Sequence, residues 1–141
     1  MSLFSSLDIS ASGLYAERVR MDVVANNIAN VESGGEGGTA YRRREVLLAS
    51  RSANDGRNAP GSGQQPGGVA VAAVREDTSP PLLVYRPDDP TADAQGYIHL
   101  SNVNLPIEMV DMVAASRAYE ANAAALRTGR EMLKRALDIM R

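Results

Sequence analysis

The chain has 141 residues, a formal net charge of -2, no cysteine, no Trp, one Phe and five Tyr. Its length fits one domain, or one small domain with appendages, and the scarcity of aromatic residues leaves Leu, Val, Met and Ala to form a core. The lack of cysteine excludes disulfides, thiolate metal sites and cysteine nucleophiles, and without a basic excess there is no reason to expect a nucleic-acid partner.

The first residues do not resemble a secretory signal peptide. The stretch MSLFSSLDIS has no basic start and reaches an acidic residue at Asp8, whereas a signal peptide begins with basic residues and a longer apolar run. No apolar run approaches the roughly 18 residues that span a bilayer. If the protein works outside the cytoplasm, we expect an export route that does not use a cleavable signal peptide.

An amphipathic helix is predicted from about residue 3 to residue 31, within an N-terminal segment bounded at 1–32. Val24 belongs to a companion apolar row that Ser10 and Glu17 interrupt. Such rows are typical of a helix that buries a narrow stripe against partner helices. The main row, with a spacing of seven residues, consists of Leu7, Leu14, Met21 and Ile28.

The segment 33–104 is predicted to be a small β-rich insert. It opens with the flexible run SGGEGG and continues with four short runs rich in apolar and β-branched residues, separated by Gly, Pro and Asp turns. These runs are YRRREVLLAS (41–50), GVAVAAV (68–74), LLVYR (82–86) and YIHL (97–100). The Gly- and Pro-rich stretch 53–68 indicates a mobile surface loop.

A second heptad helix is predicted over 105–141, with Asn104 as its N-cap and Pro106 in its first turn. At 1.5 Å per residue it would be roughly 55 Å long. Its main row contains Leu105, Met112, Tyr119, Leu126, Leu133 and Met140, and its second row contains Met109, Ala123 and Leu137, interrupted by Ser116 and Arg130.

Together these elements predict an α+β fold. Long N- and C-terminal heptad helices form a coiled-coil-like core, and the β-rich insert lies between them in the chain. Each helix carries apolar residues outside its rows, such as Val110, Val113 and Ala121 in the last helix, so one partner helix cannot cover all of its apolar surface. Two interpretations remain open: a helical hairpin packed on its own insert, or a helix pair that completes its burial against other copies or related subunits.

The sequence offers no convincing catalytic, cofactor or metal site. His99 is the only histidine and alternates within a strand, and the aspartates of PDDPTAD (87–93) fit a turn flanked by prolines. A calcium loop would need a fuller pattern of oxygen ligands and a closing Glu, and GSGQQPGG lacks the third glycine and the helix of a nucleotide site. We therefore predict no enzyme, no cofactor, no metal and no small-molecule substrate.

Three consecutive arginines, Arg42, Arg43 and Arg44, form the only basic cluster. On a strand their side chains alternate between faces, so they do not form one patch for nucleic acid. A solvated edge and salt bridges between subunits both remain open.

Two motifs carry a family resemblance. The first helix ends in ANNIANVES, and the last helix lies within NVNLPIEMVDMVAASRAYEANAAALRTGREMLKRAL. Both resemble the axial proteins of the bacterial flagellum, which form the rod, the hook and their relatives. YRRREVLL, the run from VYRPDDPTADAQGY to NVNL, and the short chain are similar to the proximal-rod subunits within that family. The long Gly/Pro loop departs from the resemblance.

The resemblance implies a structural subunit of the proximal rod of the flagellar basal body, in the periplasm. Its terminal helices would pack around the export channel in the drive shaft that transmits torque. Its partners would be other copies, other rod proteins, the basal adaptor, the membrane ring and, during secretion, the flagellar type III export apparatus. Two alternatives stay open: another short rod protein, and a helical export adaptor or chaperone.

Three asparagines near the end of the first helix raise a separate question, because asparagine is a poor helix former. Asn26 and Asn30 share a face, and Asn27 lies about 100° round the helix. One hypothesis is that they set the register between rod subunits and satisfy backbone groups where the helix stops. The alternative is a simple C-terminal cap, since asparagine tolerates left-handed conformations.

The predicted assembly interface combines both helices, and in the free subunit we expect fast amide exchange across residues 3–31 and 105–141. The interface residues are Leu7, Leu14, Met21, Val24, Asn26, Asn27, Ile28 and Asn30 from the first helix, and Met109, Met112, Tyr119, Ala123, Leu126, Leu133, Leu137 and Met140 from the last.

Overall fold

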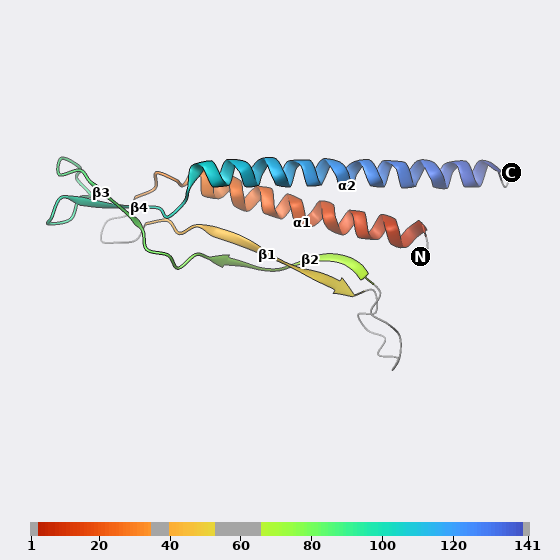
Figure 1. Ribbon diagram of the computed structural model, residues 1–141, viewed down its shortest axis with the longest axis horizontal. Coiled ribbons are helices and arrows are strands. Elements are labelled where there is room, and N and C mark those ends of the chain that lie inside the picture. The colour runs from red at the N-terminus through yellow and green to blue at the C-terminus, as the bar shows by residue number, and fades with distance from the viewer. Residues whose placement is uncertain (1–2, 35–39, 53–65, 140–141) are drawn as a thin grey trace, which may run out of the picture. The chain divides into compact units, whose positions relative to one another are not determined.

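The structure is a computed structural model that describes residues 3–34, 40–52 and 66–139 (Figure 1). It contains α1 (Leu3–Ala29), β1 (Arg44–Ser52), β2 (Pro66–Glu76), β3 (Leu82–Tyr85), β4 (Tyr97–Leu100) and α2 (Leu105–Ile139). The predicted α+β fold, with a long helix at each end and a β insert between them, is confirmed. Met140 and residues 53–65 of the predicted mobile loop lie outside the described residues. In the described part, no helix is long and apolar enough to cross a membrane.

Helix α1 ends by tightening its last turn. The Asn30 N–H bonds to the carbonyls of Asn26 at 3.2 Å and Asn27 at 3.1 Å, and the Val31 N–H bonds to the Ile28 carbonyl at 3.3 Å. Bonds of this i→i+3 type are common at helix ends. Among the described residues no non-glycine residue has a positive φ, so α1 stops without the left-handed asparagine that the cap interpretation allowed.

Helix α2 begins with the predicted cap. The Asn104 side-chain oxygen accepts a bond from the Ile107 N–H at 3.4 Å, and its carbonyl accepts one from the Glu108 N–H at 3.0 Å. These contacts satisfy donors that the first turn of a helix leaves open. Pro106 follows in the first turn, where its missing N–H costs nothing.

The four strands form two separate two-stranded sheets, β1 with β2 and β3 with β4. Strands β3 and β4 are antiparallel, with Val84 opposite Ile98 and Tyr85 opposite Tyr97. Ile98 is 4% exposed and anchors this hairpin in the interior. Strand β1 begins at Arg44 rather than at Tyr41 as predicted, and the N–H of the preceding residue, Arg43, donates to the Asn102 side chain instead of to a neighbouring strand.

The chain forms two compact units. Unit 1 comprises residues 1–19, 47–73 and 114–141, and unit 2 comprises residues 20–46 and 74–113. Each unit contains a part of both helices and a part of the insert.

Within each unit the two helix parts pack antiparallel, as pairs of facing residues show. In unit 1 Leu7 faces Gly129 and Gly13 faces Asn122. In unit 2 Arg20 faces Asp111 and Asn27 faces Glu108.

The row of α2 that faces α1 differs from the prediction by one residue. Glu108 and Ala115 are fully buried, and seven and fourteen residues after Ala115 come Asn122 and Gly129, which face α1. The predicted second row, from Met109 to Leu137, is displaced by about 100°, and Met109 and Leu137 are 57% and 61% exposed. Small and hydrogen-bonded side chains take the inner row, since they let the two helices approach closely, and Met109 and Leu137 turn outward.

Candidate functional site

Asn27 of α1 lies at the centre of a polar junction inside unit 2. Its side chain is fully buried. The amide nitrogen donates to the Arg44 carbonyl at 2.8 Å and to Glu108 Oε2 at 2.9 Å. The amide oxygen accepts from the Arg44 N–H and from the Tyr41 hydroxyl, both at 2.9 Å. All four hydrogen-bonding positions of the amide are therefore occupied.

The geometry explains why an asparagine stands at this position. Its amide pairs with both backbone groups of Arg44, as a neighbouring strand residue would, and it holds the start of β1 against α1. Aspartate has no donor for Glu108 or for the Arg44 carbonyl and would place a second carboxylate beside Glu108. Alanine would leave buried polar groups without partners, at about 1–3 kcal/mol each.

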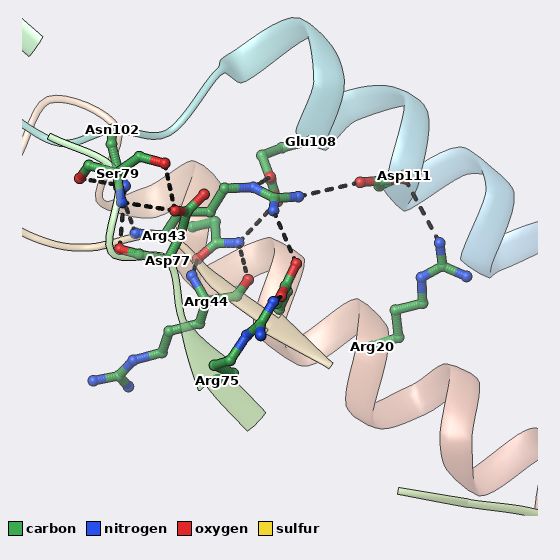
Figure 2. A network of polar contacts seen from close by, with 11 residues as sticks. Arg20, Arg43, Arg44, Arg75, Asp77, Ser79, Asn102, Glu108 and Asp111 are labelled. Atoms are coloured by element: carbon green, nitrogen blue, oxygen red, sulfur yellow. Dashed lines mark hydrogen bonds and ion pairs between the residues drawn. The ribbon is translucent and has the colours of Figure 1, made fainter. Parts of the chain in front are cut away.

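Glu108 brings helix α2 into the same junction. Its carboxylate is fully buried, and its second oxygen accepts a hydrogen bond from Arg43 Nε at 2.6 Å (Figure 2). A buried carboxylate is costly unless it is both paired and hydrogen-bonded, and Arg43 and Asn27 meet both conditions. Burial works against the charge of the Arg43 guanidinium, but the hydrogen bond and charge of Glu108 outweigh it, so the pKa of Arg43 is raised above its ordinary value.

Arg43 connects three parts of unit 2. Its guanidinium also reaches Asp111 at 3.5 Å, and Asp111 pairs with Arg20 of α1 at 3.6 Å (Figure 2). The backbone N–H of Arg43 donates to the side-chain oxygen of Asn102 at 2.7 Å. Helix α1, helix α2 and the segment before α2 are thus tied to one residue at the entrance to β1.

Asn102 and Asp77 close the junction on the side of the insert. The Asn102 amide nitrogen donates to the carbonyls of Asp77 and Ser79, each at 3.3 Å. The Asp77 N–H in turn donates to the Arg43 carbonyl at 2.7 Å. Hydrogen bonds from the Ser79 hydroxyl and N–H hold the pKa of the Asp77 carboxyl below its usual value.

The arginine cluster separates as its alternation predicted. The Arg43 side chain points inward to Glu108, whereas Arg44 is about half exposed and pairs with Glu76 at 3.0 Å. Arg75 of β2 pairs with Glu45 of β1 beside them. Arg42 is exposed. The ion pairs of Arg43 and Arg44 therefore form within one subunit.

The other two asparagines serve the helix end. Asn26 is exposed, and its side chain donates to the Asp22 carbonyl at 2.8 Å. Asn30 donates to the Asn26 carbonyl at 2.8 Å and accepts from the Ser33 hydroxyl at 3.0 Å. Only the Asn30 bond lies in the last turn of the helix, where the role in satisfying backbone groups was predicted, and the predicted role in register between subunits stays a prediction.

The outward side of α2 is the second feature of the site. Ile107, Met109, Val110 and Val113 are exposed by 53–69% over the first turns of the helix. We call these four residues the outer face. Only Met109 among them belongs to a heptad row and was therefore predicted as an interface residue.

Apart from Leu137, which is 61% exposed, the other apolar residues of the predicted interface that the structure describes lie closer to the interior. Val24 is 5% exposed, and Tyr119 is 36% exposed. The half-buried members are Leu7, Leu14, Met21, Ile28, Met112, Ala123, Leu126 and Leu133. These residues contribute to packing inside the subunit, and their part in assembly stays a prediction.

No group of three or more His, Cys, Asp or Glu side chains that could hold a metal ion occurs in the described part of the chain. His99 lies in β4 with its Nε2 atom 4.0 Å from Asp93. The buried polar side chains of the junction bond to one another and to backbone groups. In the described part of the chain, paired terminal helices are thus fixed by a polar junction and retain an exposed apolar face.

Comparison with known proteins identifies the family. Residues 7–35 match the family model described as flagella basal body rod protein, and residues 94–139 match the one described as flagellar basal body rod FlgEFG protein C-terminal. The chain is 44% identical to the flagellar basal-body rod protein FlgC of Bacillus subtilis and 43% identical to that of Borreliella burgdorferi, over 99% of each chain. It is 39% identical to FlgC of Salmonella typhimurium, over 99% of this chain and 98% of the relative. The chain belongs to the FlgC family of flagellar basal-body rod proteins.

Proposed function

We propose that this basal-body rod subunit assembles with other rod proteins through the outer face of α2, while the polar junction holds α1 and β1 in place against that helix. The observation that carries the proposal is the exposure of Ile107, Met109, Val110 and Val113 in a chain of a rod-protein family. A contiguous exposed apolar surface of this kind is typical of a protein interface.

Burial of the outer face in an interface would stabilise the assembly. Full burial of a Val or Ile side chain contributes about 1.5–3 kcal/mol, and Val110 is 69% exposed. The junction lies directly behind the face, since Glu108 and Asp111 occupy the inner side of the same turns. A rigid helix loses little conformational entropy when its exposed face is covered.

The finer assignment follows the family resemblance. The subunit belongs to the proximal rod, is passed through the flagellar type III export apparatus without a cleavable signal peptide, and assembles in the periplasm. Its terminal helices surround the export channel, and the rod transmits torque. Its neighbours include further copies and, at the base, the adaptor and the membrane ring. The 39–44% identity to FlgC proteins supports this assignment.

Mass spectrometry of washed hook–basal bodies tests the proposal. The chain is expected there, and in basal bodies from a mutant that stops before the hook. Val110→Lys is expected to reduce the amount of the chain in basal bodies at least tenfold, because a charge would be buried in the interface. Val74→Lys is the matched control, since Val74 of β2 is also exposed, at 47%. Val110→Lys subunits at the normal level in basal bodies would contradict the proposal.

A further inference from the structure

The hairpin β3–β4 carries an exposed apolar face. Leu83 pairs with His99 and Tyr85 with Tyr97, so these four side chains share one side of the sheet. The Tyr85 and Tyr97 rings meet edge to face with centroids 5.2 Å apart. Leu83, Tyr85 and Tyr97 are 56%, 62% and 41% exposed. We call these three residues the hairpin face.

An acidic turn borders the hairpin face. Between β3 and β4 the chain has three aspartates, Asp88, Asp89 and Asp93, and one arginine, Arg86. Asp89 accepts bonds from the N–H and hydroxyl of Thr91 at 2.9 and 2.7 Å, which fixes the turn. The hairpin face therefore combines aromatic and aliphatic contact area with a negative border.

The end of α2 carries a surface of opposite charge. Met132, Leu137 and Ile139 are 52%, 61% and 85% exposed. The last part of the helix has four cations (Arg127, Arg130, Lys134 and Arg135) against two carboxylates (Glu131 and Asp138). Leu7 of α1 faces Gly129 of α2, and the two helices run antiparallel, so Leu3, the first described residue of α1, lies near residue 133 of α2. The described part of α1 therefore does not extend along the last turn of α2. Met132 and Ile139 share one face of the helix end, and Leu137 lies about 140° round it, beside Arg130 and Lys134. We call the residues Met132, Leu137 and Ile139, which surround the end of α2, the terminal surface.

A rod requires contacts between two different surfaces. Subunits that follow one another along an open helical assembly meet head to tail, so one surface of each subunit must fit another surface of the next. Opposite charge around two apolar patches favours such a pairing and opposes the pairing of like patches. The exposed apolar residues of the β1–β2 sheet show no such charge excess, because Arg44 and Arg75 pair there with Glu76 and Glu45.

We propose that the hairpin face of one subunit docks on the terminal surface of a second copy of this chain. The proposal rests on the proposed function, since it names the partner and the contact through which rod subunits follow one another. It involves residues other than the outer face of α2.

Cysteine cross-linking tests this contact directly, because the chain has no native cysteine. Two differently tagged subunits, Leu83→Cys and Leu137→Cys, are produced together, and washed basal bodies are oxidised. We expect a disulfide-linked dimer that carries both tags, and no such dimer when Leu83→Cys is combined with Val74→Cys. Tyr85→Cys with Ile139→Cys is the second pair if either variant fails to assemble.

The outcomes separate the two proposals. Both variants in basal bodies without the mixed dimer, or with Leu83→Cys linked to a different rod protein, would overturn the docking of a second copy while leaving the rod assignment intact. Absence of the unsubstituted chain from basal bodies would overturn both. As an independent check, Asp88→Lys should lower the amount of chain in basal bodies, and Lys134→Asp in the same subunit should restore part of it.

Discussion

The two units of the molecule hold the same pair of helices by different means. In unit 2 the helices meet through Asn27 and Glu108, whose fully buried side chains are completely hydrogen-bonded. In unit 1 the buried apolar side chains among the described residues are alanines, Ala16 and Ala115. Hydrogen-bonded polar groups accept one alignment only, whereas small side chains permit close approach without selecting a partner. In unit 2 the polar junction therefore fixes how the two helices are aligned.

The largest effect is expected from Asn27→Ala. The change removes four hydrogen bonds, one of them to the buried Glu108 carboxylate and three to half-buried groups of Arg44 and Tyr41, so the free energy of unfolding should fall by about 3–5 kcal/mol. Chemical denaturation of the purified subunit measures this. Asn26→Ala is the matched control, because Asn26 is exposed and bonds only within its own helix. Equal losses in the two variants would contradict the contrast between the units.

Glu108→Gln is expected to lower the free energy of unfolding by a smaller amount. The side chain keeps its shape but loses the charge that Arg43 neutralises, and Arg43 then keeps only its longer ion pairs with Asp111 and Glu45, at 3.5 and 3.7 Å. Because the Arg43 side chain is 21% exposed, water relieves part of this cost, and the expected loss is about 2–3 kcal/mol. The same denaturation experiment applies, with Glu120→Gln on the exposed side of α2 as control. A neutral Glu108→Gln variant would show that the ion pair does not hold the junction.

Gly68→Ala should loosen the contact between β2 and α1 in unit 1. Gly68 has a φ of 106°, and a Cβ there would lie 2.2 Å from the Ser12 hydroxyl. That hydroxyl accepts the Val69 N–H at 3.1 Å. We expect the free energy of unfolding to fall by about 1–2 kcal/mol and amide exchange at Val69 to become faster. Gly34→Ala, whose Cβ would meet nothing closer than 3.4 Å, should leave exchange unchanged; unchanged exchange at Val69 would refute the prediction.

The smallest effect concerns pH. Hydrogen bonds from Ser79 and Thr91 lower the pKa values of Asp77 and Asp89. The two turns are therefore stabilised above the ordinary carboxyl pKa, and this stabilisation is lost as pH falls through the lowered values. Amide shifts of Ser79 and Thr91 should move together with these carboxyls in an NMR titration. Asp89→Asn should abolish the response at Thr91 alone, and a persisting response there would exclude Asp89 as its source.

The helices and strands were largely predictable because their signals are local. Heptad spacing, the Asn104 cap and alternating strands lie within short windows of sequence, and the resemblance to flagellar rod proteins rests on such windows. Asn27 was singled out because it breaks helix propensity. Glu108, its partner, was not singled out, because 81 residues separate it from Asn27. Taken alone, Glu108 fits the ordinary place of an acid in the first turn of a helix.

The row of α2 that packs against α1 inside the subunit was not predicted, for a related reason, whereas the part of Met109 and Leu137 in assembly stays a prediction. A heptad count selects large apolar residues, such as Met109 and Leu137, and treats asparagine and glycine as interruptions. The structure instead places Asn122 and Gly129 toward α1, where Gly13 and Leu7 need the space. Which small residue faces which neighbour depends on the alignment of the two helices, and a heptad count in one helix does not contain that alignment.

Hydrogen–deuterium exchange of the free subunit tests the contrast between the two units most directly. The sequence predicts fast amide exchange along both helices of the free subunit. Because the polar junction holds the helix parts of unit 2, we now expect fast exchange only in the helix parts of unit 1. We expect slow exchange in residues 20–29 and 105–113, fast exchange in residues 3–19 and 114–139, and protection of all four segments in assembled basal bodies. Uniform protection of both helices in the free subunit, or faster exchange in the junction segments than elsewhere, would contradict the account.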